Sequence, residues 1–166
     1  MKAITEYLTR SARNKTPTDL ALTRRNAWAL SIAGYIPFAI FTLGLWVLLP
    51  ETELYSFNID ALKTYGAVIL SFLGGVRWGL ALKSASEVPA RRELIYAVIP
   101  SLVGWFSLNL DEPYVFAVQA LAFAAHGAWD TLSGERGTFA MWFVKLRMVL
   151  TFLVTGALIA AFFATV

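Results

Sequence analysis

Residues 61–83 read "ALKTYGAVILSFLGGVRWGLALK", a long apolar stretch that nevertheless carries an arginine at position 77. An α-helix needs roughly 20 consecutive, mainly apolar residues to cross the hydrocarbon core of a bilayer. An arginine at such a depth costs roughly 2–3 kcal/mol unless it meets water or a partner. The stretch therefore predicts a transmembrane helix, and Arg77 predicts a polar partner elsewhere in the chain.

The whole sequence has the composition of a membrane protein. Of its 166 residues, 58% are hydrophobic and only 15% are charged, whereas about 25% is usual for the charged residues of a soluble domain. Its five apolar segments are residues 28–49, 61–83, 94–110, 113–130 and 143–165. We therefore expect an all-α, polytopic membrane bundle of five transmembrane helices over residues 28–166. A basic N-terminal tail or interfacial segment, residues 1–27, precedes it.

The charges between the segments indicate the number of crossings and the orientation. Because the third and fourth segments are short and joined by only "DEP", four crossings are the alternative to five. Lys and Arg cluster before the first segment, after the second and after the fourth. The other loops carry acidic residues, which are Glu51, Glu53 and Asp60 in one and Asp111 and Glu112 in the other. This alternation favours five crossings, with the N-terminus in the cytoplasm or matrix and the C-terminus outside. It also explains the net charge of +3 without nucleic-acid binding.

Small residues on the second segment predict a helix-packing face. Ser71, Gly75 and Gly79 recur every four residues, a pattern that lets two helix backbones approach closely in a membrane. Arg77 lies two residues from Gly75, which is about 200° around the helix at about 100° per residue. We therefore expect a helix that is enclosed on both sides rather than lipid-facing.

The fourth segment offers partners for Arg77. Side chains lean toward the N-terminus of their helix, so Arg77 leans toward the bilayer centre and away from the inner surface. On the fourth segment, Gln119, His126 and Asp130 are spaced by seven and four residues and share one helix face. Counted back from the inner ends of the two segments, Arg77 lies six residues deep and His126 four, so these two depths match. The sequence therefore predicts that Arg77 pairs with Asp130, that His126 and Gln119 extend the polar line, and that the two segments are neighbours.

This polar cluster has three possible roles. It is a buried ion pair that fixes helix register, a site for a small anionic or quinone-like ligand between Arg77, His126, Trp78 and Trp129, or part of a proton relay or transport path. The chain has no Cys and one His, which argues against a metal or haem site built by this chain alone. We find no catalytic motif in the sequence, so we expect no enzyme, no metal and no cofactor.

Four stretches resemble a known family. They are "GYIPF" (34–38), "SFLGGVRWG" (71–79), "IPSLVGW" (99–105) and "WFVKLRMVLT" (142–151). They are similar to an uncharacterised family of small membrane proteins in proteobacteria that includes the mitochondrial transmembrane protein 69. The similarity covers about residues 28–160 and implies a fold and a bacterial inner-membrane location (mitochondrial inner membrane in a eukaryote), but no reaction. Where family members have a Trp-Tyr pair, this chain has Trp142-Phe143.

Two functions from different classes follow as expectations. The first is a non-enzymatic accessory or assembly component of a larger respiratory or photosynthetic complex, with the bilayer and other membrane subunits as partners. The second is a binder or carrier of a small quinone-like or anionic ligand, centred on Arg77, His126 and Asp130. A closed, partly polar cavity between the second and fourth segments would favour the second.

Overall fold

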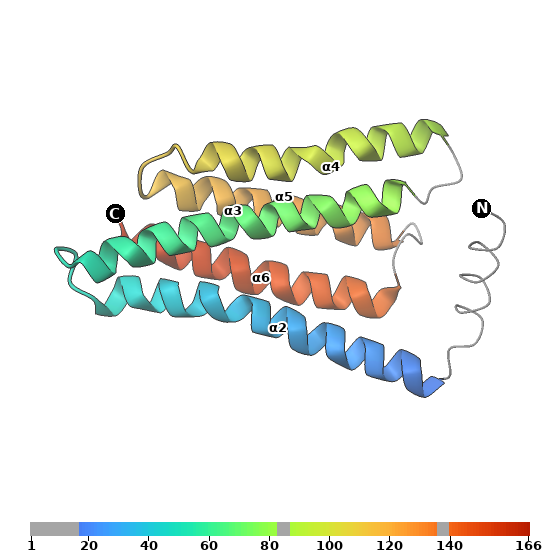
Figure 1. Ribbon diagram of the computed structural model, residues 1–166, viewed down its shortest axis with the longest axis horizontal. Coiled ribbons are helices and arrows are strands. Elements are labelled where there is room, and N and C mark those ends of the chain that lie inside the picture. The colour runs from blue at the N-terminus through green and yellow to red at the C-terminus, as the bar shows by residue number, and fades with distance from the viewer. Residues whose placement is uncertain (1–16, 83–86, 136–139) are drawn as a thin grey trace. The chain divides into compact units, whose positions relative to one another are not determined.

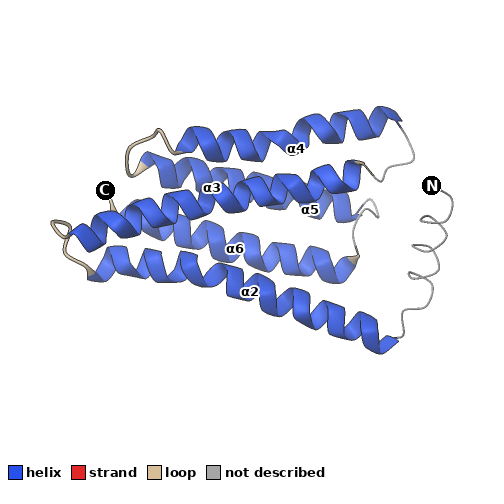
Figure 2. Ribbon diagram, in the orientation of Figure 1, coloured by secondary structure: helices blue, strands red, loops and turns tan. Residues whose placement is uncertain are grey.

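The computed structural model describes residues 17–82, 87–135 and 140–166. They form five helices, which are α2 (Pro17–Val47), α3 (Glu53–Ala81), α4 (Glu87–Ser107), α5 (Tyr114–Glu135) and α6 (Met141–Ala164). No strand occurs among these residues (Figure 2), which confirms the all-α prediction. The chain divides into two units, Met1–Gly34 and Tyr35–Val166, and the second contains every contact discussed below.

Several helices begin well before the apolar segments do. Hydropathy marks where apolar residues start, whereas a helix continues through polar residues as long as its backbone groups are bonded. For α3, the hydroxyl of Thr52 accepts a hydrogen bond from the backbone N–H of Tyr55 at 3.2 Å, and Glu53 lies in the first turn. For α2, the described part of the helix runs from Pro17 through the polar residues that precede the first apolar segment. Residues 17–27, expected in the tail or interfacial segment, therefore belong to α2, and residues 1–16 lie outside the described part.

In the second unit the chain reverses direction at each connection, so that α3, α4, α5 and α6 run lengthwise beside one another (Figure 1). Helix α3 packs against α4, α5 packs against α6, and α5 also contacts both α3 and α4. The predicted contact between the second and fourth apolar segments is therefore confirmed. Phe38, in the second half of α2, is buried and places its ring edge-to-face on Tyr65 of α3 and Phe123 of α5.

The packing face of α3 is not the predicted one. Ser71, Gly75 and Gly79 are all exposed, and a Cβ on Gly75 or Gly79 would meet no atom of the described part of this unit within 4 Å. The close approach is at Gly74, where a Cβ would collide with the backbone carbonyl of Ala97 on α4. The spacing of small residues singles out Gly75, whereas Gly74 shares its face with the buried apolar residues Leu70 and Ala67, which pack inside the bundle.

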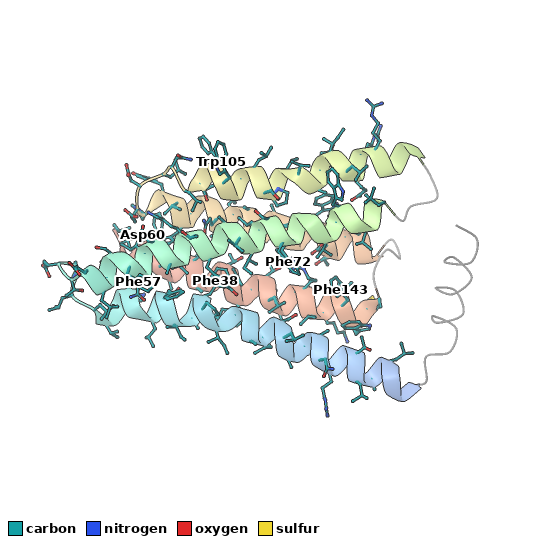
Figure 3. All side chains as sticks on the ribbon, in the orientation of Figure 1. Phe38, Phe57, Asp60, Phe72, Trp105 and Phe143 are labelled. Carbon is teal, nitrogen blue, oxygen red and sulfur yellow. The ribbon has the colours of Figure 1, made fainter. Side chains whose placement is uncertain are left out.

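The outer surface of the helices is strongly apolar. Phe72 on α3 and Trp105 on α4 are 64% and 67% exposed (Figure 3). By length and composition, three helices of the described part can cross a membrane, which are Leu20–Val47, Glu53–Ala81 and Met141–Ala164. Such a surface is suited to lipid rather than to water.

Candidate functional site: a buried charge cluster beside an apolar groove

Arg77 on α3 and Asp130 on α5 lie in direct contact. Nε of Arg77 donates a hydrogen bond to Oδ1 of Asp130 at 2.9 Å, and Nη2 lies 2.8 Å from the same oxygen. Nη2 also donates to the hydroxyl of Ser133 at 3.0 Å. The two charged side chains are only 2% and 6% exposed. The arginine that seemed anomalous in the sequence is thus paired inside the bundle and joins α3 to α5.

A second arginine shares the same carboxylate. Nε of Arg147, on α6, donates to Oδ2 of Asp130 at 2.6 Å. On the other side, Nη1 of Arg77 lies 3.6 Å from Oε2 of Glu93 on α4, a residue that is partly exposed. Buried charges are tolerated only when they are paired and hydrogen-bonded. Four helices therefore meet at this cluster, and Asp130 is the acceptor that both arginines use.

A glycine on α5 explains how Arg147 reaches Asp130. Gly127 lies against the side chain of Thr151 on α6, so closely that a Cβ there would collide with it. Asp130 is three residues after Gly127, and Arg147 is four residues before Thr151. Because residues three or four apart share a helix face, the close contact at Gly127 brings the two charged side chains together one turn away.

The same arrangement recurs between α3 and α4. Gly74 lies against the carbonyl of Ala97, Arg77 is three residues after Gly74, and Glu93 is four residues before Ala97. The antiparallel helices therefore bring Arg77 and Glu93 together one turn from their closest approach. Two glycine contacts thus position the cluster.

Trp129 covers one side of the charged cluster. Cζ of Arg77 lies 4.3 Å from the centre of its ring, a cation–π contact. The same indole makes edge-to-face contacts with His126 at 5.8 Å and with Tyr96 at 5.9 Å. Nε2 of His126 lies 3.8 Å from Oδ2 of Asp130. An aromatic layer therefore lies against the charged cluster.

Beyond this layer, α4 and α5 enclose a groove of about 560 Å³. Its α4 wall consists of Tyr96, Ile99, Pro100 and Val103. Its α5 wall consists of Val118, Leu121, Ala122, Ala125, His126 and Trp129. Apart from the aromatic residues with polar atoms at one end, the lining side chains are aliphatic. The expected cavity between the second and fourth segments is instead a groove between the third and fourth, because α3 meets α5 through its buried side chains.

Two of the residues expected at the cluster lie elsewhere. Gln119 is fully buried two turns away, where its Nε2 donates to the carbonyl of Lys63 at 2.8 Å and to the hydroxyl of Ser107 at 3.0 Å. It therefore ties α5 to α3 and α4 instead of extending the cluster. Trp78 is 44% exposed and does not line the groove. Of the two tryptophans expected beside Arg77, only Trp129 has its ring against the guanidinium among the described contacts.

Arg147, Glu93 and Tyr96 were not expected at the site. The sequence could have placed Arg147 at the cluster, because Arg147 lies four residues into the fifth apolar segment, at a depth like that of His126. It was grouped with the loop charges that set orientation. Glu93 and Tyr96 gave no signal, because nothing in the sequence fixes which face of α4 meets α5.

The groove beside the charge cluster has room for an uncharged molecule. Among the described residues, no three His, Cys, Asp or Glu side chains are grouped to hold a metal ion. The donors of Arg77 are directed at Asp130, Ser133 and Glu93. In contrast, Nδ1 of His126 is buried without a hydrogen-bond partner among the described residues. The imidazole of His126 is thus a buried polar group at the groove that can still accept or donate a hydrogen bond.

The fold and the cluster define a helical-bundle transmembrane protein with a buried ion-pair network. The chain belongs to the family described as "Protein of unknown function (DUF3429)", which matches residues 23–163. It is 35% identical to "Transmembrane protein 69" of Xenopus tropicalis over 138 residues, which are 80% of this chain and 51% of the frog protein. It is 31% identical to "Transmembrane protein 69" of Mus musculus over 144 residues, which are 84% of this chain and 56% of the mouse protein. The chain thus spans about half the length of these curated relatives, and the family resemblance is confirmed. No solved structure matches it.

Proposed function

We propose that this protein binds an uncharged, largely apolar small molecule from the membrane in the groove between α4 and α5. The observation that carries this proposal is the aliphatic groove that ends at His126, whose buried Nδ1 has no partner in the described chain. Its volume of about 560 Å³ lies in the range of roughly 300–1,000 Å³ that is usual for small-molecule sites. Such sites combine apolar walls with a few polar groups that fix orientation.

The charge cluster favours an uncharged ligand over an anionic one. An anion would need a guanidinium with free donors, and Arg77 directs its own at two carboxylates and a hydroxyl. Trp129 also lies between Arg77 and the groove, since it contacts the guanidinium and lines the groove. We assign Arg77 a positioning role, in which it holds Trp129 and Asp130 and, through them, orients His126.

A groove-filling substitution tests this function. Ala125 lines the groove, so Ala125→Phe places a ring where the ligand would lie. We expect molecules that co-purify with the wild-type protein in mild detergent to fall at least tenfold in this variant. Native mass spectrometry of the intact protein, followed by extraction and identification of the bound molecules, measures the change.

Ala128→Phe is the matched control, because Ala128 is an exposed alanine on the same helix that does not line the groove. It should keep the bound molecules of the wild type. Equal occupancy in both variants, or a wild-type protein that carries no such molecule from native membranes, would contradict the proposal.

The proposal includes a full membrane topology. We place all five helices across a bacterial inner membrane, or the mitochondrial inner membrane in a eukaryote, with the N-terminus in the cytoplasm or matrix. Support comes from the alternation of basic and acidic loops and from the side-by-side packing of α4 and α5 with two helices that can span alone. Because the chain has no cysteine, single cysteines in the loops, labelled from either side of the membrane, test each crossing.

A second candidate function is an accessory role in a larger membrane complex. It is favoured by the exposed face of Ser71, Gly75 and Gly79 on α3, because small residues of this kind let transmembrane helices associate. Gly75→Leu should then remove a co-purifying subunit from native membranes while the bound small molecule stays. An unchanged set of co-purifying proteins would rule out this face as the contact.

A further inference from the structure

The groove has a hydrogen-bond acceptor on its α5 wall. His126 lines the groove, and its Nε2 lies 3.8 Å from Oδ2 of Asp130. Because Nε2 is the ring nitrogen nearer the carboxylate, we assign the proton of the neutral imidazole to it. Nδ1, which lies on the other side of the ring, is then an acceptor, and it has no partner in the described chain. Since the χ2 torsion of histidine is soft, a small rotation of the ring presents Nδ1 to the groove.

A second acceptor lies on the α4 wall. Pro100 is inside α4 and lines the groove. Proline has no N–H, so the carbonyl of Tyr96, four residues earlier, lacks its usual helical donor. The i to i−4 direction runs along the helix axis, so this carbonyl is on the same face as Pro100. In a membrane, a backbone carbonyl freed in this way must find another donor.

We propose that the molecule bound in the groove carries a free hydroxyl group, which donates a hydrogen bond to Nδ1 of His126 or to the carbonyl of Tyr96. Nδ1 of His126 and the carbonyl of Tyr96 are both acceptors, so a ligand that offers only carbonyl or ether oxygens leaves these two groups unpaired. This inference rests on the proposed function and sharpens it, since it names the ligand as an apolar alcohol. Leaving a buried polar group unpaired costs free energy. A ligand with a hydroxyl group avoids this cost and therefore binds more tightly than one without it.

Two kinds of membrane molecule share this chemistry. One is an aliphatic alcohol, such as a long-chain alcohol or a diacylglycerol. The other is a prenylated hydroquinone, whose oxidised quinone form has acceptor oxygens in place of hydroxyl donors. The groove walls are aliphatic along most of their length and aromatic near His126, so both kinds of apolar body can fit.

A pair of matched photoreactive probes tests the inference. The full chain is reconstituted in phosphatidylcholine nanodiscs and labelled with a long-chain alcohol that carries a diazirine, or with its methyl ether. Labelled peptides are identified by mass spectrometry. We expect the alcohol to label the α4–α5 groove with a half-saturation concentration about tenfold lower than the ether does. Competition with a diacylglycerol, a prenylated hydroquinone and the matching quinone distinguishes the two sources, and the quinone should compete least.

Two substitutions remove the acceptors separately. His126→Phe keeps an aromatic ring and deletes Nδ1. Pro100→Ala restores an N–H to the carbonyl of Tyr96 and adds a helical hydrogen bond, so it keeps the inference testable even where His126→Phe fails to fold. We expect each variant to lower the preference for the alcohol, and labelling by the ether to change little.

The outcomes separate the two proposals. Equal labelling of the groove by alcohol and ether overturns the hydroxyl inference and leaves groove binding intact. A preference for the alcohol that survives in both variants overturns the assignment of the two acceptors. Absence of groove labelling by either probe overturns the proposed function itself.

Discussion

Asp130→Asn is expected to reduce the free energy of unfolding by about 3–5 kcal/mol, the usual cost of removing one partner from a buried ion pair. Asp130 accepts hydrogen bonds from Arg77 at 2.9 Å and from Arg147 at 2.6 Å. Asparagine keeps the shape but not the charge, so both guanidinium groups lose their common counter-ion inside the bundle. Unfolding in mixed detergent–SDS micelles, followed by tryptophan fluorescence, measures the change.

Asp60→Asn is the control for this substitution. Asp60 also contacts a cation, with Nζ of Lys63 at 2.8 Å, but its side chain is 67% exposed. We expect a change within about 0.5 kcal/mol, because exposed ion pairs contribute little.

A double variant separates charge from packing. Adding Arg147→Leu to Asp130→Asn removes one of the two uncompensated cations, so part of the lost stability should return. Arg77 would still have Ser133 and Glu93 within reach. If the double variant were less stable by the sum of the two single changes, the charges would not be coupled and Asp130 would not be their common acceptor.

Gly74→Ala is expected to destabilise the protein by about 1–3 kcal/mol, the typical cost of overpacking a close contact. A Cβ at position 74 would collide with the carbonyl of Ala97, and a backbone atom can yield only if the whole helix moves. Moving α4 also separates Glu93 from Arg77, since both lie one turn from this contact. The measurement is the same unfolding experiment.

Gly75→Ala is a control one residue away. A Cβ at position 75 meets nothing within 4 Å in the described part of the second unit, and alanine is a better helix former than glycine by roughly 0.5–1 kcal/mol. The variant should therefore be as stable as the wild type or slightly more stable. The opposite order of the two variants would show that α3 packs through the face predicted from sequence.

These experiments separate the framework of the site from its binding surface. Asp130 and Gly74 hold helices together, whereas Ala125 and His126 line the groove. Loss of bound ligand with little loss of stability is expected for Ala125→Phe, and not for Asp130→Asn or Gly74→Ala. The buried ion-pair role and the ligand role that were alternatives in the sequence are therefore compatible, because the ion pair orients the histidine that faces the groove.

The sequence by itself determined the class of protein and predicted the five helices of the described residues, and it nominated Asp130 as a partner for Arg77. Each depends on a property that can be read from the order of residues along the chain. The length of an apolar run predicts a helix, the charge of a loop indicates a side of the membrane, and depth from a boundary tells which polar residues lie at the same level. Arg147 could have been added by the same count of depth.

Only the tertiary structure decided how each helix is rotated about its own axis. In a soluble helix a polar face indicates the rotation, but these helices are apolar on most faces because lipid and protein interior are alike in polarity. The sequence therefore predicted the wrong glycine face of α3 and the wrong place for Gln119: Gly74 meets α4, and Gln119 ties α5 to Lys63 and Ser107. Close contacts at Gly74 and Gly127 settle these rotations, and with them the groove.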